Sequence, residues 1–296
     1  MALSPNLRGA LFMAIAMAGF TINDTFTKSV AAHLNVGQIM LVRGLMASVL
    51  MFIYCWKTDA LRPPKMLLRP AVIGRSLGEM LGTVTFLIGL QHIPLGNASA
   101  ILQALPLAVT MGAALFLNEK VGWRRWLAIF IGFLGVIIVV RPGADGFNSW
   151  SLMIVACVVF CMFRDLVTRA APKDIPSAFL ALSTTCMITS TGLLLYIPLG
   201  GWVPVTPILL AKLAAASVCL LFGYLFVIQA MRIGEIGFVA PFRYTGLLWA
   251  LTLGFLTLGE VPDLTTLAGA GVIIASGVYA FHRERLHSRK PIEQGA

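Results

Sequence analysis

Long apolar stretches dominate this 296-residue chain and restrict what it can fold into. A helix needs roughly 20 apolar residues to cross the hydrocarbon core of a bilayer. The sequence contains ten such stretches, separated by short segments rich in charge, proline or glycine. They are Leu7–Ala31, Val36–Trp56, Pro70–Gln91, Leu95–Asn118, Trp123–Val140, Ser149–Ala170, Pro176–Leu199, Pro207–Met231, Gly237–Leu258 and Leu264–Phe281. Runs of this length without alternation of apolar and polar residues predict membrane-spanning helices rather than strands.

The composition supports an all-α membrane protein. Hydrophobic residues make up 58% of the chain and charged residues 11%, whereas soluble domains have about 45–50% and about 25%. We assign the net charge of +10 to loops facing the cytoplasm and anionic lipid, not to nucleic-acid binding. The five cysteines are an odd number and all lie in apolar stretches, which argues against a disulfide framework and a zinc site.

The positions of the basic residues predict the orientation. With the N-terminus inside, most loop lysines and arginines fall on the side of the two termini, against Lys28 and Arg141 on the opposite side. Cytoplasmic loops carry such an excess of positive charge. We therefore expect a multi-pass protein of the bacterial inner membrane with both termini in the cytoplasm and an even number of spans.

A weak internal repeat appears at a spacing of about 140 residues. The pattern DTFTK at 24–28 matches DLVTR at 165–169, and FLI at 86–88 matches FVI at 226–228. LNE at 117–119 likewise matches LGE at 258–260. Each half then holds five helices, so the second half must cross the membrane inverted relative to the first. We expect repeats at 1–143 and 144–281, followed by a basic cytoplasmic tail at 282–296.

The same residues resemble a known family. The stretch GNASAILQALP at 96–106, the LNE at 117–119, Trp126, Gly135 and the RPG at 141–143 are similar to an EamA domain of the drug/metabolite transporter superfamily. Residues from Phe226 through LGE at 258–260 to Gly277 resemble a second copy. The resemblance implies ten helices in two inverted five-helix repeats and a central cavity between them. Alphaproteobacterial members that take up riboflavin or S-adenosylmethionine have similar half-motifs.

Charged side chains inside spans are costly, so they face a cavity or a partner. Arg75 and Glu79 lie four residues apart on one helix face, where they can pair. Glu79 lies roughly 14 Å from the cytoplasmic end of its helix, close to the membrane midplane. It is a candidate site for a coupling proton or a substrate amine; the alternative is a structural ion pair.

A second group of candidate substrate-binding residues lies in the ninth stretch. Arg243 follows Pro241, which frees a backbone carbonyl inside a span. The repeat spacing places Gln103 opposite Arg243, whose guanidinium can clamp a carboxylate, a phosphate or a carbonyl. The alternative is an arginine that extends to the lipid headgroups. Aromatic rings that suit a flat heteroaromatic solute lie nearby at Tyr224, Tyr244 and Trp249.

Further charged residues are expected to act as gates or structural ion pairs. Asp24 and Arg43 are expected to pair near the outer leaflet. Asp165 mirrors Asp24 in the repeat, and its neighbour Arg164 is expected to extend to the cytoplasmic interface. Glu119 and Glu260 precede the fifth and tenth stretches, where they are expected to cap the following helices.

These features predict a secondary transporter that moves a small organic metabolite by alternating access. Our first expectation for the solute is a heteroaromatic vitamin such as riboflavin, and the second is an amino acid or a derivative such as S-adenosylmethionine. A membrane-embedded enzyme and a channel are the alternatives from other classes. The sequence has no GxxxxGK[ST] or HExxH motif, so we expect no enzyme, cofactor or metal. The expected partners are the solute, lipid and a coupling proton, with no nucleic acid, in a monomer or homodimer.

Overall fold

The computed structural model describes residues 4–119, 121–142, 148–172, 174–234 and 236–288, without the side chains of 169, 231–232, 236–237 and 283–288. The first half contains α1 (Pro5–Ala31), α2 (Val36–Lys57), the 3-10 helix η1 (Pro64–Leu68), α3 (Pro70–His92), α4 (Leu95–Leu102), α5 (Leu105–Phe116) and α6 (Trp123–Val140). The second contains α7 (Ser151–Ala170), α8 (Ser177–Leu195), α9 (Pro207–Ile233), α10 (Ile236–Val239), the 3-10 helix η2 (Ala240–Tyr244), α11 (Thr245–Leu258) and α12 (Leu264–Ser288). The predicted boundary at 143/144 and residues 289–296 of the predicted tail lie outside the described residues, whereas residues 282–288 of that tail belong to α12.

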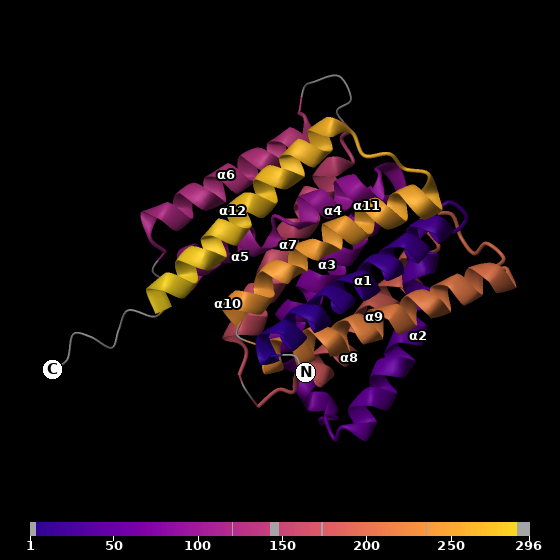
Figure 1. Cartoon of the computed structure of the whole chain (residues 1–296). Helices are drawn as coiled ribbons and strands as arrows, with labels where there is room; N and C mark the ends of the chain where they lie inside the picture. The colour runs from indigo at the N-terminus through magenta and orange to yellow at the C-terminus, as the bar shows by residue number, and fades with distance from the viewer. Residues whose placement is uncertain (1–3, 120, 143–147, 173, 235, 289–296) are drawn as a thin grey trace.

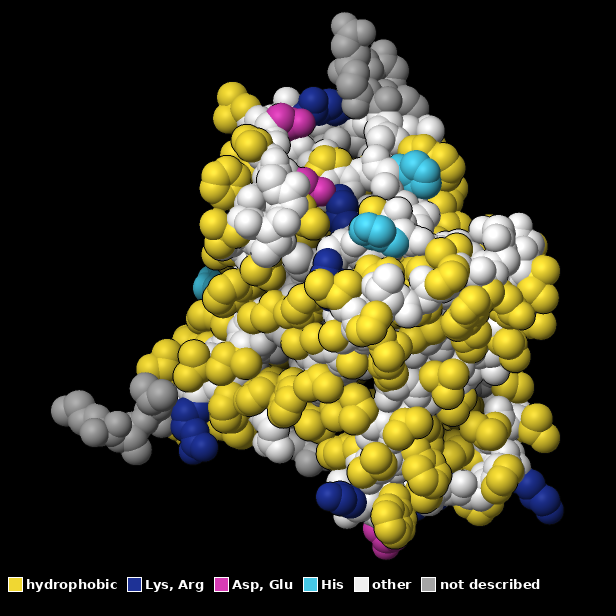
Figure 2. All heavy atoms as spheres, turned by 90° about the vertical axis from the view of Figure 1, so that its right-hand side faces the viewer, with side chains coloured by type: hydrophobic (Ala, Val, Ile, Leu, Met, Phe, Trp, Pro, Cys, Tyr) yellow, Lys and Arg dark blue, Asp and Glu magenta, His cyan; other side chains and the backbone are white. Residues whose placement is uncertain are grey.

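The outer surface of the bundle is apolar, as a membrane requires. Within the described residues, nine spans are long and apolar enough to cross a bilayer, and the tenth predicted stretch is divided among α10, η2 and α11. Large side chains such as Phe52, Leu194 and Phe255 are exposed on the outside, while Gln38, Thr27 and Ser217 are buried inside. Figure 2 shows one face covered mostly by hydrophobic side chains, with most charged side chains toward its upper and lower ends. The exposed apolar surface therefore faces lipid.

The two halves are interleaved rather than side by side. α1 packs mainly against α9, and the corresponding helices of the repeat, α7 and α3, also pack against each other. α2 packs against its counterpart α8, and α6 packs against its counterpart α12. This pattern is that of a two-fold relation between inverted halves. Figure 1 shows the N-terminus and the end of α12 toward the same lower-left side; we call this the terminal face and the opposite one the distal face.

One predicted span in each half is interrupted. The stretch Leu95–Asn118, expected as one helix, forms two. α4 ends at Leu102, and α5 begins at Leu105 with Pro106 in its first turn. The stretch expected as Gly237–Leu258 tightens into η2, which has Pro241 in its first turn. Proline lacks the amide hydrogen that a continuous helix needs, so each of the two spans is interrupted near its proline. The breaks put a turn at Gln103 and 3-10 backbone at Arg243, the residues that the repeat aligns.

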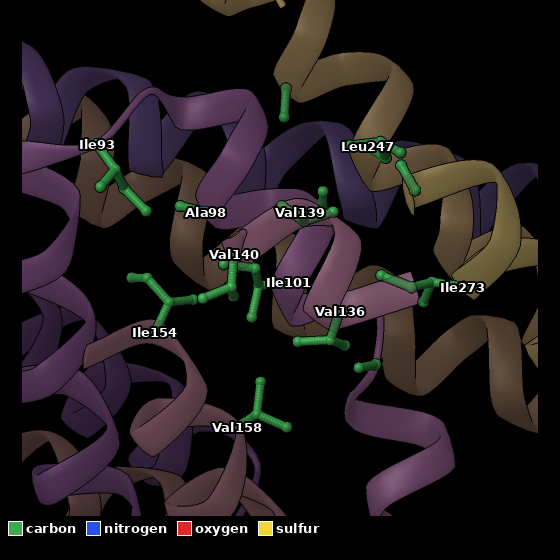
Figure 3. Close-up of a cluster of buried hydrophobic side chains, with 14 of the residues drawn as sticks. Ile93, Ala98, Ile101, Val136, Val139, Val140, Ile154, Val158, Leu247 and Ile273 are labelled. Atoms are coloured by element: carbon green, nitrogen blue, oxygen red, sulfur yellow. The ribbon is translucent and has the colours of Figure 1, made fainter. Parts of the chain in front are cut away.

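A buried apolar cluster links the two halves behind these breaks. Figure 3 shows Ile101 of α4 near Val136 and Val140 of α6, with Ile154 and Val158 of α7 close by. Leu247 of α11 and Ile273 of α12 complete the same cluster. Lipid tails are as apolar as these side chains, so the cluster stabilises the interleaved arrangement through close van der Waals packing rather than through the hydrophobic effect.

Glycines bring α2 and α8 into backbone contact. A Cβ atom at Gly37 would lie 2.4 Å from the Tyr196 nitrogen, and one at Gly192 would lie 2.4 Å from the Leu41 nitrogen. Backbone atoms cannot move aside as flexible side chains do. Only glycine therefore allows this crossing, as at other close contacts between membrane helices.

We predict that Gly37→Ala lowers the stability of the purified protein by roughly 1–3 kcal/mol, because the added methyl group forces the two helices apart. Thermal unfolding in detergent measures the effect. Gly271→Ala is the matched control, since a Cβ atom there meets nothing within 4 Å. Equal unfolding temperatures for Gly37→Ala and the unchanged protein would contradict the prediction.

Candidate functional site

An ion-paired arginine connects the centres of α3 and α7. Arg164 Nη1 donates to Glu79 Oε2 at 2.8 Å, and Arg164 Nε donates to Asp165 Oδ1 at 2.8 Å. The Arg164 and Glu79 side chains are only 16% and 13% exposed. Gly78 lets α3 and α7 approach closely enough for this ion pair to form, because a Cβ atom at Gly78 would lie only 3.0 Å from the Arg164 Cβ. Our expectation that Arg164 extends to the interface is therefore wrong.

Arg75 does not pair with Glu79, in contrast to the sequence prediction. Arg75 Nη1 instead donates to Thr168 Oγ1 of α7 at 2.9 Å, and its Nε is buried without a hydrogen-bond partner. Both side chains of α3 thus bind α7 rather than each other. The spacing of four residues correctly places Arg75 and Glu79 on one face of α3. It does not predict their partners, which lie on the neighbouring helix α7.

A second polar group lies between α1 and α2. Arg43 Nη1 donates to Asn23 Oδ1 at 3.0 Å and to Thr27 Oγ1 at 3.3 Å. Asn23 Nδ2 in turn donates to Asp24 Oδ1 at 2.9 Å. The predicted association of Asp24 with Arg43 is thus mediated by Asn23, although the two charges also interact through space. The sequence analysis missed Asn23. Its only sequence signal is an amide side chain next to Asp24 within an apolar stretch.

Tyr224 of α9 joins the two groups. Its phenol is close enough to Glu79 and Arg164 for electrostatic interaction, and Arg43 also interacts with Glu79 and Tyr224. The ring of Tyr224 contacts Phe20 of α1 edge-on, with centroids 5.3 Å apart. Five helices, α1, α2, α3, α7 and α9, therefore contribute to one continuous polar centre.

Arg243 faces this centre from the broken ninth span. Its side chain is exposed to solvent, yet its charge interacts with Asp165 and Arg164 of α7. The segment that carries it, η2, packs mainly against α1, α10, α11 and α12 rather than α7. Arg243 and Asp165 thus place opposite charges on η2 and α7, and the Asp165 side chain is 29% exposed. We call Glu79, Arg164, Asp165, Tyr224 and Arg243 the central cluster.

The remaining predicted residues lie at different distances from the central cluster. Gln103 is buried, and its Nε2 lies 3.6 Å from where a Cβ atom of Gly246 would be. The Tyr244 hydroxyl is buried without a partner against Gly277 of α12. Trp249 is 40% exposed and donates to the carbonyl of Ala14 at 3.3 Å. Tyr244 therefore packs against α12 while it still interacts electrostatically with Arg243, and Trp249 binds α1.

Two small pockets lie elsewhere in the bundle. One, with an empty volume of about 190 Å³, lies beside Glu260 and is lined by Pro94, Gly96, Asn97, Ala250, Leu251, Gly254, Glu260 and Pro262. The other, of about 180 Å³, is lined by Pro106, Leu107, Thr110, Gly277, Ala280 and Phe281. Neither is lined by a residue of the central cluster.

The described residues form no metal-ligand group, since no three histidine, cysteine or acidic side chains converge. Residues 74–78 match the GxSxG pattern of serine hydrolases, but they lie within helix α3. Ser76 is buried there, 3.5 Å from Thr184 Oγ1. A nucleophile elbow needs a strand-to-helix turn that exposes its serine, so this match carries no catalytic meaning.

Comparison with known proteins gives a consistent picture. The profile of the EamA-like transporter family matches residues 7–141. The chain is 30% identical to a riboflavin transporter of Vibrio cholerae and 25% identical to an S-adenosylmethionine uptake transporter of Rickettsia prowazekii, each over 96% of both chains. It is 27% identical to a pseudopaline exporter of Pseudomonas aeruginosa over 94% of this chain and 96% of the other.

A solved structure has the same fold, with a TM-score of 0.64 at 15% identity over 94% of this chain and 98% of that one; its title is "Crystal structure of protein". The nine spans of the described residues, the interrupted tenth stretch and the apolar outer surface are those of a multi-pass membrane protein. The chain belongs to the EamA-like transporter family and is a multi-pass membrane transporter.

Proposed function

We propose that this transporter carries a small zwitterionic metabolite that has an α-amino acid group. One observation carries the proposal: the exposed Arg243 side chain interacts electrostatically with the partly exposed Asp165 carboxylate of α7. A guanidinium binds a carboxylate through two parallel hydrogen bonds, and a carboxylate pairs with an ammonium group. The two charges thus match the two ends of an amino acid group.

S-adenosylmethionine is the first solute that we propose. It combines an α-amino acid group with a flat adenine ring and a positive sulfonium. Relatives at 25% identity over nearly the full length are S-adenosylmethionine uptake transporters. The acidic side chains of the central cluster, Glu79 and Asp165, are suited to a solute with this additional positive charge.

Riboflavin is the second candidate, because the relative at 30% identity is a riboflavin transporter. The Tyr224 ring next to Phe20 offers one aromatic surface for a flat ring. Arg243 can donate to the carbonyl groups of a flavin. The Tyr244 ring packs against Gly277 and Trp249 binds the Ala14 carbonyl, whereas a flavin needs a larger aromatic lining, so we favour the zwitterion.

We propose Glu79 as the site of a coupling proton. In the ion pair, the Glu79 carboxylate on α3 binds the guanidinium of Arg164 on α7. Protonation would remove the negative charge, weaken the ion pair and free Arg164 to interact with the solute. A proton and a solute carboxylate would thus act on the same arginine, which is a physical basis for coupling their movements.

The proposal includes the arrangement in the membrane. Repeats at 1–143 and 144–281 would rock against each other, with the terminal face and the tail from 282 in the cytoplasm. The excess of basic residues in the loops of the terminal face supports this orientation. The transporter would act as a monomer or a homodimer, with lipid and solute as its other partners.

We predict that Arg243→Ala raises the KM for S-adenosylmethionine uptake into proteoliposomes by roughly 10- to 100-fold, the loss expected for a charge-assisted hydrogen bond of about 1.5–3 kcal/mol. Arg62→Ala is the matched control, because Arg62 is exposed and donates only to nearby backbone carbonyls. Wild-type kinetics for a folded Arg243→Ala protein with both S-adenosylmethionine and riboflavin would refute the proposed site.

We predict that Glu79→Gln abolishes solute accumulation driven by a pH gradient but leaves exchange of labelled for unlabelled solute, because glutamine cannot carry the coupling proton. Proteoliposomes with and without an imposed gradient measure both activities. Asp59→Asn in an exposed loop is the control, since asparagine tolerates the positive φ of 57° there. Accumulation by Glu79→Gln that still follows the gradient would exclude Glu79 as the proton site.

A further inference from the structure

A buried ion pair ties the halves together at the distal face. Lys28 Nζ of α1 lies 2.5 Å from Glu260 Oε1, and the two side chains are 14% and 19% exposed. Lys28 also donates to the carbonyl of Ile93 at the end of α3. Glu260 Oε2 accepts from the Leu95 amide, the first residue of α4, at 2.6 Å. In Figure 1 the ends of α1 and α11 lie together, away from the N-terminus.

Glu260 thus has a different role from the one expected. The sequence predicted that it caps the helix that follows it, but it binds the positive N-terminal end of α4 in the other half. α12 is capped instead by Asp263, which accepts from the Thr266 amide at 2.6 Å. Burial raises the pKa of Asp263, but the Thr266 hydrogen bonds and the charge of Arg141 outweigh it and hold the pKa below its usual value.

Other contacts across the halves cluster at the same face. Gln38 Nε2 donates to the Val203 carbonyl at 2.6 Å, and the Val203 amide donates back to Gln38 Oε1 at 3.1 Å. Asn148 donates to the His92 carbonyl at 3.0 Å, and the His92 ring stacks on Trp150. The Lys28–Glu260 pair lies at the same face, and its Glu260 lines the pocket described above. These interactions join the two halves at the distal face.

The internal repeat places the same local geometry at the terminal face. The Glu260 amide donates to the Gly254 carbonyl at 3.0 Å, and the Glu119 amide donates to the corresponding Ala113 carbonyl at 3.2 Å. The preceding residues, Gly259 and Asn118, are both left-handed, with φ of 67° and 55°. The turn that presents Glu260 is thus built a second time around Glu119, at the opposite side of the membrane.

The sequence repeat also aligns a basic residue with Lys28. Arg169 occupies the position of Lys28 in the DTFTK and DLVTR patterns, although its side chain lies outside the described residues. Ile233, at the end of α9, likewise occupies the position of Ile93. An inverted repeat of a latch gives one copy to each mouth of the pathway, and alternating access requires that the two do not open together.

We propose that the Lys28–Glu260 ion pair is the latch that holds the distal mouth closed, and that Glu119 serves the terminal mouth in the same way. The pair joins α1 and the α3–α4 junction to the end of α11, so opening the distal mouth must break it. Its contribution is part of the free-energy difference between the two conformations, and removing it shifts their populations. The proposal rests on transport by alternating access but not on any particular solute.

The test uses the full chain in proteoliposomes without solute. Asn97 lines the pocket beside Glu260, so Asn97→Cys reports access from the distal side to a membrane-impermeant maleimide. Cys186 and Cys219 are replaced by serine because they are at least partly exposed. Cys55 and Cys157 are buried and stay in place, so that their labelling detects a variant that has simply unfolded.

We expect Lys28→Gln and Glu260→Gln to raise the rate of Asn97→Cys labelling roughly tenfold, within the usual range of conformational coupling. Lys28→Arg, which keeps the charge, should label at a rate close to that of the unchanged latch, and Lys57→Gln at an exposed helix end is the matched control. Glu119→Gln should lower the rate, since it releases the opposite mouth.

Unchanged labelling in Lys28→Gln, with Cys55 still protected, would overturn the proposal. Equal acceleration by Lys28→Arg and Lys28→Gln would also overturn it, because the effect would then not depend on the ion pair. Neither outcome would bear on Arg243 or Glu79, whose test is solute transport. The latch and the proposed solute site can therefore fail independently.

Discussion

The cost of placing charge inside a membrane governs this structure. Several arginines and carboxylates lie within spans, where an isolated charge would cost about 3 kcal/mol or more. Two of them show how a neighbouring helix makes such a charge tolerable: Glu79 is held by Arg164, and Arg43 is held by Asn23 and Thr27. Removing one member of a buried pair typically costs about 3–5 kcal/mol, because the other charge remains. The halves therefore cannot separate without exposing charge to lipid.

The inverted repeat gives this constraint a functional use. Each half contributes one broken span near the centre, and the residues at the breaks, Gln103 and Arg243, are aligned by the repeat. Broken helices offer backbone groups and side chains that an intact span would keep in its own ladder. A polar centre shared by interleaved halves can be reached from either side as the halves rock. The fold thus provides a solute site and two mouths from one duplicated unit.

The sequence predicts the fold well because its signals are one-dimensional. Span length, the positions of prolines and the depth of Glu79 all follow from counting residues along a helix. The partner of Glu79 does not, because Arg75 at four residues and Arg164 on α7 are both within reach of an extended side chain. The contact at Gly78 decides in favour of Arg164, and it depends on how α3 and α7 cross.

The directions of the side chains in the ninth predicted span also could not be predicted from the sequence. Tyr244 and Arg243 are neighbours, yet η2 directs the tyrosine toward Gly277 and the arginine toward Asp165. A continuous helix would have separated them by about 100°, but the 3-10 turn at Pro241 changes the angle for every residue after it. The role of Glu260 was missed for a related reason, since its helix partner is 165 residues away in the chain.

A structure of the protein in lipid with S-adenosylmethionine tests the central claim most directly. The account predicts solute density between η2 and α7, with its carboxylate on Arg243 and its amine near Asp165. Solute bound elsewhere, with Arg243 turned toward lipid or the space between η2 and α7 filled by side chains, would contradict it.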